Sequence, residues 1–263
     1  FNLEEGWNWI GYTPQVALNL NTALDNIQDG NAEYLKSQSG FADYYSGFGW
    51  FGTLESMNPL EGFQILISES SEFVYNEGDE VFNTISDNYK NIFDLNIYDY
   101  EYNGSITAIV SENGDHINTD NYFLAAYHDE KCVGFTESLV FPLNGNRIFP
   151  LMIYGNEDNH LLEFKLYDTI SETYYEINEK LTFSSDMHLG DGLHPIQLHV
   201  THAPIEYSVG LPYPNPFNPI VNFDLTLAEE SHVRVSIYDI AGHKVSTVHD
   251  GILDAKKHKI FWM

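Results

Sequence analysis

Aromatic side chains gather near the start of the sequence and could form a ligand-binding surface. The stretch "FADYYSGFGW" places five aromatic residues among four small ones, which leave the rings room to project from a loop. Flat rings of this kind stack on the C–H faces of sugars, and ligand sites combine apolar walls with a few placed polar groups. The predicted aromatic platform is Tyr44, Tyr45, Phe48 and Trp50. The wider cluster comprises Trp7, Trp9, Tyr12, Phe41, Tyr44, Tyr45, Phe48, Trp50 and Phe51.

The same rings have a second interpretation. Large aromatics dominate the energetics of protein cores as well as of binding surfaces. In a small module with few aliphatic residues they would fill the interior, and we favour this interpretation for the cluster as a whole.

Acidic loops supply the second candidate site, a calcium centre. Ca²⁺ needs hard oxygen ligands, and Asp recurs here in turns rich in Asn and Gly. None of these loops has the spacing of an EF-hand, and hairpin turns use the same residues, so ordinary turn chemistry is the favoured interpretation of any single loop. Calcium is the one cofactor that the sequence suggests. Its predicted ligands are Asp115, Asp120, Asp158, Asp186 and Asp191.

Other reactive residues point to no catalytic chemistry. His188, His194, His199 and His202 lie close together, but their spacing matches no zinc motif. Cys132 is the only cysteine and is expected to be a small buried hydrophobe. The sequence has no G-x-S-x-G elbow, no H-E-x-x-H and no Gly-rich phosphate loop. We therefore predict that the chain is not an enzyme.

Composition excludes two classes of partner. The 263 residues include 39 acidic and 11 basic ones, a formal net charge of −28, which would repel nucleic acid and anionic membranes. No window approaches the roughly 20 apolar residues of a membrane span, so we expect no membrane insertion. The start at Phe1 shows no signal peptide and fits a mature or excised fragment.

The pattern along the chain predicts a mostly β protein, with immunoglobulin-like β-sandwich modules in tandem after a small mixed α+β module. Strand-length runs alternate with Asn-Gly turns through the middle of the chain, which is typical of a sandwich. Closely spaced prolines then stiffen the chain, and Val221, Phe223, Leu225 and Leu227 begin a new strand by strict alternation. The expected segments are an aromatic-rich module over 1–77, a β-sandwich over 78–204, a Pro-rich linker over 205–219 and an incomplete immunoglobulin-like domain over 220–263.

The last of these segments resembles a known family. "YPNPFNPIVNFDLTLAEESHVRVSIYDIAGHKVSTVHDG" is similar to the type A-like C-terminal sorting domain of type IX secretion cargo. The resemblance implies a non-catalytic tail that is read by the outer-membrane secretion machinery of Bacteroidetes-like bacteria. The family pattern continues beyond Trp262 with about two more strands, so we expect the domain to be incomplete here. The sorting motif is Pro214, Asn215, Pro216, Phe217, Asn218 and Pro219.

Two upstream segments also look familiar. "GWNWIGYTP" with "LKSQSGFADYYSGFGWFGTLESMNPLEGFQILI" is similar to a Gly-Trp-Asn module of large secreted bacterial proteins. "DNYFLAAYHDEKCVGFTE" with "MIYGNEDNHLLEFKLYD" resembles a β-sandwich that is often found beside it. Neither resemblance implies an activity or a site residue.

These features together predict a non-catalytic protein, secreted to the surface of a Gram-negative bacterium, with a structural or adhesive role. Such a protein could assemble with copies of itself by adding a strand at the unfinished last domain. An alternative is an accessory carbohydrate-binding region of a larger secreted hydrolase, with surface polysaccharide as its partner. A third hypothesis, a hydrolase built on the sandwich, would need a buried carboxyl pair with shifted pKa values.

Overall fold

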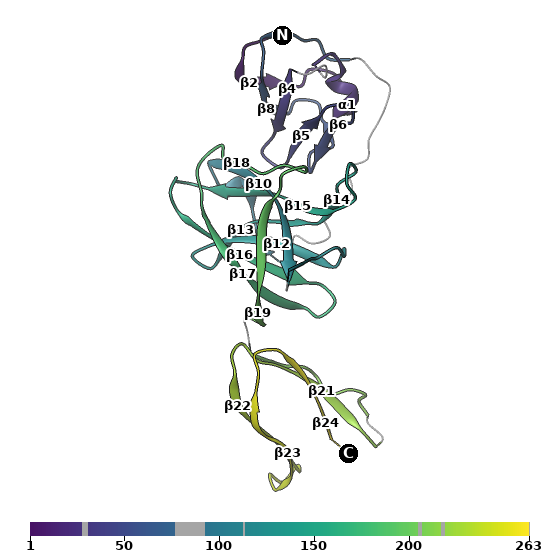
Figure 1. The fold of residues 1–263 in the computed structure, drawn as a ribbon, viewed down its shortest axis with the longest axis vertical. Coiled ribbons are helices and arrows are strands. Elements are labelled where there is room, and N and C mark those ends of the chain that lie inside the picture. Colours follow the sequence, from purple (N-terminus) through teal and green to yellow (C-terminus); the bar gives the residue numbers. More distant parts are fainter. Residues whose placement is uncertain (28–30, 77–92, 113, 205–206, 217–218, 263) are drawn as a thin grey trace.

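The structure is a computed structural model, and it describes residues 1–27, 31–76, 93–112, 114–204, 207–216 and 219–262. Strands dominate these residues, which confirms the predicted mostly β class. Figure 1 shows three bodies along the long axis of the molecule. We call them the N-terminal module (1–76), the central module (93–204) and the C-terminal module (207–262).

The N-terminal module is built on a five-stranded antiparallel sheet. Its elements are β1 (Asn2–Leu3), β2 (Gly6–Gly11), β3 (Leu18–Asn19), α1 (Leu20–Ala23), the 3-10 helix η1 (Asp25–Ile27), β4 (Ala32–Lys36), β5 (Phe41–Tyr45), β6 (Gly49–Gly52), β7 (Ser56–Met57), β8 (Gly62–Ile67) and β9 (Ser71–Glu72). The strand order is β2-β8-β4-β5-β6. Side chains alternate between the two faces of a sheet, so Leu35 and Ile65 face the module's own core while Tyr34 and Phe41 face the central module.

The central module is a large sheet that curls around one apolar core. Its elements are the 3-10 helix η2 (Ile97–Asp99), β10 (Tyr102–Glu112), β11 (Asp115–His116), β12 (Tyr122–His128), β13 (Lys131–Glu137), β14 (Leu139–Val140), β15 (Arg147–Gly155), β16 (Leu161–Asp168), β17 (Thr173–Thr182), β18 (His188–Leu189) and β19 (Ile196–Pro204). The order is β13-β12-β16-β17-β19-β10-β15-β14. Leu124, Phe149, Phe164 and Leu198 come from separate strands of this path and meet in one core.

β13, at one end of that path, approaches β15, the strand next to the other end, at Gly134. A Cβ built on Gly134 of β13 would lie 2.2 Å from the carbonyl oxygen of Met152 on β15. Only glycine allows the backbones to come this close, because every other residue would place its Cβ inside that contact. β13 therefore packs closely against β15, which brings the two ends of the sheet together. The immunoglobulin-like form of the sheet stays a prediction.

The C-terminal module begins after the prolines and has a thin core. Its strands are β20 (Ser208–Val209), β21 (Val221–Thr226), β22 (Ser231–Tyr238), β23 (Lys244–Leu253) and β24 (Lys257–Trp262). The predicted alternating strand from Val221 is confirmed as β21. β20, β21 and β24 form one sheet, and β22 and β23 form a separate hairpin. Among the described residues of this module, the buried hydrophobic side chains are Val221, Leu225 and Leu227.

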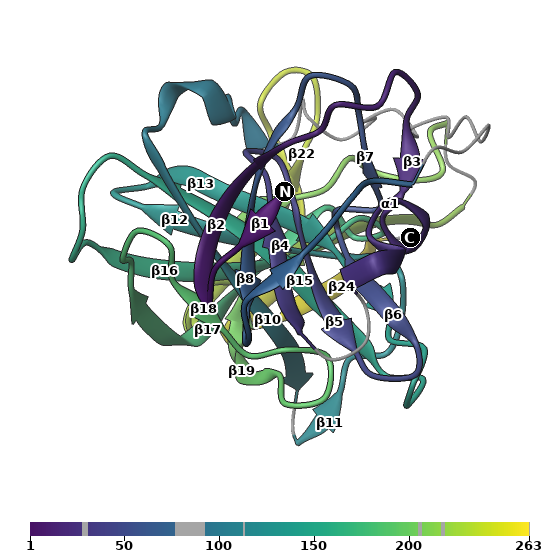
Figure 2. The ribbon, with the colours of Figure 1, turned by 90° about the horizontal axis from the view of Figure 1, so that it is seen from above.

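Helices contribute little to the described ranges. None of the helices found there is both long enough and apolar enough to cross a membrane. Seen from above, the N-terminal module overlies the central one, with β2 along its outer side (Figure 2).

Candidate functional site

The four residues of the predicted aromatic platform lie in different environments. Tyr45 and Trp50 are buried, each with 5% of its surface exposed, whereas Tyr44 is half-buried and Phe48 is exposed. Trp50 belongs to the core of the N-terminal module, and Tyr45 packs against the central module. The structure does not bring these rings together on one exposed surface, because strand geometry directs neighbours such as Tyr44 and Tyr45 to opposite faces.

The five predicted calcium ligands do not converge either. Asp186 contacts the Lys36 ammonium at 2.5 Å, and Asp191 accepts hydrogen bonds from the backbone amides of Leu193 and His194. Within the described ranges, no group of three or more acidic, histidine or cysteine side chains could hold a metal ion. Local turn hydrogen bonds of this kind occupy Asp191. Asp158 instead accepts a hydrogen bond from the amide of Ser185, which is 27 residues away along the chain. Asp115 and Asp120 are exposed.

The histidines and the cysteine are likewise dispersed. His194 lies beside Asp191 and His199 beside Glu179, while His188 is drawn into the module junction described next. The His202 side chain lies outside the described part. Cys132 is buried, as expected, and burial raises its pKa to about 11, so it stays a protonated thiol at neutral pH.

The sorting motif lies between β20 and β21. Pro214, Asn215, Pro216 and Pro219 are exposed there, and Phe217 and Asn218 fall outside the described residues. Just before them, Tyr213 exchanges backbone hydrogen bonds of 2.7 and 2.8 Å with Asn222 of β21. The chain ahead of the motif is thereby attached to the C-terminal sheet.

A chain of polar side chains crosses the junction between the N-terminal and central modules. The Tyr34 hydroxyl on β4 lies 2.7 Å from Ser105 Oγ on β10, which in turn lies 3.0 Å from His188 Nδ1 on β18. His188 Nε2 is 3.0 Å from Asp43 Oδ1 on β5, so the chain returns to the N-terminal module. The His188 ring also packs on the Tyr34 ring, with centroids 4.1 Å apart. We call these four residues the polar joint.

Ser105, His188 and Asp43 contact one another in the order of a serine–histidine–carboxylate hydrolytic triad. Burial of the serine, however, keeps substrates from reaching it. Ser105 has no exposed surface, and its hydroxyl is shared with Tyr34. Burial raises the pKa of Tyr34 above its ordinary range, so the phenol keeps its proton. Burial also raises the pKa of Asp43, and the hydrogen bond from His188 opposes that rise. The arrangement can hold two modules together, and it offers no accessible nucleophile.

Lys36 adds a second polar contact to the junction. Only 3% of Lys36 is exposed, and its Nζ lies 2.9 Å from Asn103 Oδ1 as well as beside Asp186. Asn103 Nδ2 donates in return to the carbonyl oxygen of Ser37 at 3.2 Å. A buried ammonium group is costly unless it is paired, so these partners fix the position in which the modules dock.

Aromatic packing completes the contact. The Tyr45 ring lies 4.8 Å from Phe141 of the central module, and Phe51 lies 5.5 Å from the same ring. The Gly192 amide donates to the Tyr45 hydroxyl at 2.6 Å. Apolar and polar groups therefore both cross the junction.

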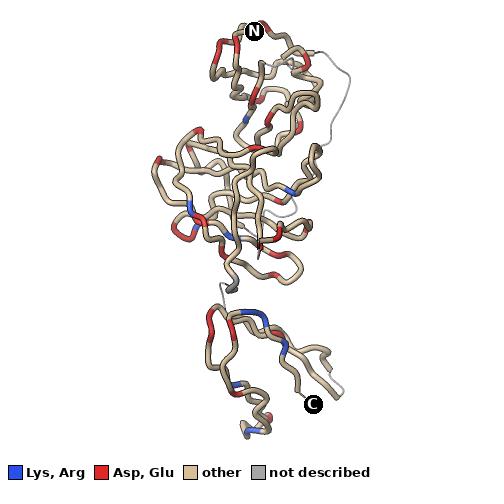
Figure 3. Tube along the Cα trace, in the orientation of Figure 1, with Lys and Arg blue, Asp and Glu red and all other residues tan. Residues whose placement is uncertain are grey.

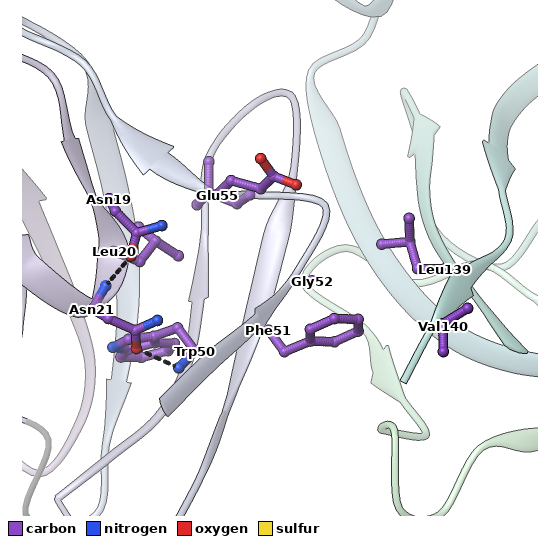
Figure 4. A pocket seen from close by; sticks show the side chains of 10 residues that line it. Asn19, Leu20, Asn21, Trp50, Phe51, Gly52, Glu55, Leu139 and Val140 are labelled. Carbon is purple, nitrogen blue, oxygen red and sulfur yellow. Dashed lines mark hydrogen bonds between the residues drawn. The ribbon is translucent and has the colours of Figure 1, made fainter. Parts of the chain in front are cut away.

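A cavity of about 280 Å³ opens beside these rings, between β6 and β14. Figure 4 shows Phe51 pointing across it toward Val140. Trp50 and Leu139 add apolar wall, and polar groups come from Asn19, Asn21 and Glu55. The Asn21 Oδ1 atom already accepts from the Trp50 amide at 2.8 Å.

Two tryptophans outside the predicted platform are the exposed ones. Trp7 and Trp9 lie on β2, the edge strand of the five-stranded sheet, with 45% and 78% of their surfaces exposed. Both belong to the aromatic stretch seen in the sequence. Their spacing of two residues in "GWNWIG" is the signal that places both on one face of a strand.

Comparison with known proteins bears on the C-terminal module. Residues 212–260 match the family described as the secretion system C-terminal sorting domain, which confirms the resemblance of the sequence motif. The match implies contact with the secretion machinery, and a cell-surface or extracellular location in a Bacteroidetes-type Gram-negative bacterium. No curated protein and no solved structure matches the chain.

Proposed function

We propose that the protein is a non-catalytic structural or adhesive component of the cell surface, exported by a type IX-like pathway. The observation that carries the proposal is the junction between the first two modules. Its polar joint occupies the serine, histidine and carboxylate that could otherwise do chemistry, and its aromatic packing ties the two modules into one body. A stiff exported body of this kind suits a surface role.

The test compares source cells that make the full chain with cells that lack it. We expect the protein in the surface or medium fraction, and weaker cell adhesion or a less regular surface layer when it is missing. Purified protein is also assayed on ester, glycoside and peptide substrates beside the Ser105→Ala variant. Turnover that the variant abolishes would make the protein an enzyme and end the proposal.

Self-assembly by strand addition is the finer part of this proposal. β24 forms an edge of its sheet, and the exposed apolar side chains Ile240, Ile252 and Phe261 lie in the same module. An open edge is a template for pairing with another chain. We expect association that grows with concentration in sedimentation velocity and that Phe261→Pro on β24 removes, because the Phe261 N–H points away from β21, toward the open edge. A full chain that stays monomeric at every concentration would contradict strand addition.

The second candidate is an accessory carbohydrate-binding region of a larger secreted hydrolase. The exposed pair Trp7 and Trp9 favours it, because an ordered strand rarely presents two indoles to water without a partner. The presence of a hydrolase domain in the same native polypeptide, measured by intact mass and peptide mapping, is its test.

A further inference from the structure

One face of the β2 edge carries an aromatic surface that extends beyond the module junction. Trp7, Trp9 and Gly11 alternate with core-facing residues along β2, so they share one face. Their partners on β8 are Leu66, Gln64 and Gly62, in that order. The two indoles are roughly 7 Å apart along the strand, since each residue advances it by about 3.4 Å. We call Trp7, Trp9, Gln64, Gly11 and Gly62 the tryptophan shelf.

The junction holds the inner indole in place. The Trp7 ring meets the Tyr34 ring edge-on, with centroids 5.7 Å apart, and Lys36 Nζ lies 5.8 Å from the Trp7 ring centre. Tyr34 and Lys36 are themselves fixed by contacts with the central module. Trp7 is therefore a preorganised surface, which lowers the entropic cost of binding.

The outer indole has the opposite character. Trp9 sits on an ordered strand, yet 78% of its surface faces water. Leaving so large an apolar ring exposed forgoes about 2 kcal/mol or more of burial free energy. A flat ring displayed in this way is suited to a partner that stacks on it.

The glycine pair beside Trp9 is an independent sign of a ligand. Gly11 and Gly62 face each other across the two strands, and neither has a positive φ that would require glycine. A Cβ on either residue would meet nothing within 4 Å. Glycine weakens a strand, and where neither backbone nor packing demands it, it often marks close approach by a ligand. Because neither glycine has a side chain, the pair leaves a flat stretch of exposed backbone next to Trp9, which we call the Gly11–Gly62 floor.

Charge selects the class of ligand. Residues 1–206 contain 33 acidic and six basic residues, so an anionic polymer would be repelled from this part of the molecule (Figure 3). The Lys36 ammonium group, which lies 5.8 Å from the Trp7 ring centre, is already paired with Asp186. Gln64 offers an uncharged amide, opposite Trp9. The ligand that fits this surface is an uncharged polymer rich in hydroxyl groups. It could stack on the Trp7 and Trp9 rings and hydrogen-bond to the Gln64 amide and to the open edge of β2.

We propose that the tryptophan shelf binds a neutral polysaccharide laid along the β2 edge. Sugar C–H faces stack on Trp7 and Trp9, hydroxyl groups pair with Gln64 and the free backbone groups of β2, and the chain passes over the Gly11–Gly62 floor. This inference rests on the carbohydrate-binding candidate for its ligand class and supplies its site.

The test uses the full chain and a panel of neutral polysaccharides (cellulose, mixed-linkage glucan, mannan, xylan and starch), with alginate as the anionic comparison. Affinity electrophoresis and pull-down on insoluble glycans measure binding. We expect at least one neutral glycan to bind, and Trp9→Ala to weaken it at least about tenfold. Gly11→Val should weaken it as much while Tm holds or rises, because Val favours a strand and its side chain enters open space. Phe48→Ala removes an exposed ring away from the shelf and should change nothing.

Three outcomes would overturn the proposal. If a neutral glycan binds and neither Trp9→Ala nor Gly11→Val weakens the binding, the glycan site lies elsewhere on the protein. The carbohydrate-binding candidate would then still stand. Absence of binding across the panel would remove that candidate as well, yet leave the structural or adhesive function standing. Self-association that Trp9→Ala abolishes, without any glycan bound, would assign the shelf to a second copy of the chain.

Discussion

At the scale of single residues, Asp168 shows how local hydrogen bonds outweigh burial. Asp168 ends β16, and its carboxylate accepts hydrogen bonds from Asn121 Nδ2, the Ile170 amide and Ser171 Oγ at 2.8 to 2.9 Å. Burial acts to raise the pKa of this carboxyl, but the hydrogen bonds to its charged form are together stronger and lower it. The charged form therefore stabilises the β16–β17 turn.

We predict that Asp168→Asn lowers the free energy of unfolding by about 1 to 3 kcal/mol at neutral pH, since the amide cannot replace all three accepted bonds. A lowered folded pKa gives a contribution that is complete above the unfolded value, near 3.9, and is lost as pH falls through the folded pKa. The difference between the two proteins should shrink below about pH 4. Urea unfolding from pH 3 to 7 measures it, with the exposed Asp115→Asn as control. A difference that grows in acid would contradict this account.

Residue chemistry could be predicted from sequence where it is local. Asp191 accepts hydrogen bonds within its own turn, the kind of contact that its Gly-rich surroundings indicated. The polar joint could not be predicted, because Ser105 and His188 meet Tyr34 and Asp43 from distant parts of the chain. The aromatic platform was predicted from the local composition of the sequence. The exposure of each ring depends instead on which face of the sheet the central module covers, and local composition does not contain that information.

At the scale of elements, the closure of the central sheet depends on Gly134. We predict that Gly134→Ala destabilises the central module by at least about 2 kcal/mol, because its Cβ would clash with backbone atoms of β15 that cannot turn aside. Gly62→Ala is the matched control, since its Cβ enters open space in a strand. Thermal unfolding of both variants measures the contrast. Equal Tm values would mean that β13 and β15 do not approach so closely.

The strands themselves could be predicted from local sequence, but the pairing of distant strands could not. The alternation from Val221 suffices to predict β21, because apolar and polar residues repeat with the period of two that a strand imposes. The pairing of β10 with β19 could not be predicted. These strands run parallel, and nearly ninety residues separate Ala108 from its partner Ile196. No turn chemistry sets such a register.

At the scale of the whole molecule, the junction should make the N-terminal and central modules unfold together. Phe141 has no exposed surface and touches rings of the other module. We predict that Phe141→Ala splits a shared calorimetric transition in two, because the variant loses packing mainly at the junction. Phe183→Ala removes an equally buried ring inside the central core and should lower the shared transition without splitting it. Two transitions already present in the unmodified protein would show that the modules are independent.

Charge is distributed unevenly over the modules. Residues 207–263 hold six acidic and five basic residues, against 33 and six in the preceding 206. Like charges repel one another in the compact state, and salt screens them, reducing the Debye length from about 30 Å at 0.01 M to about 8 Å at 0.15 M. The first two modules therefore carry a repulsion that the C-terminal module lacks.

We predict that raising sodium chloride over this range increases the Tm of the N-terminal and central modules by several degrees and leaves the C-terminal transition within about 1 °C. Calorimetry of the full chain measures both at once. Tetramethylammonium chloride at equal ionic strength is the control, because screening does not depend on the cation. Equal shifts in all modules would contradict the charge argument. Calcium chloride at matched ionic strength should add nothing, and extra stabilisation by it would reveal a bound cation, since a ligand that prefers the folded state raises Tm by mass action.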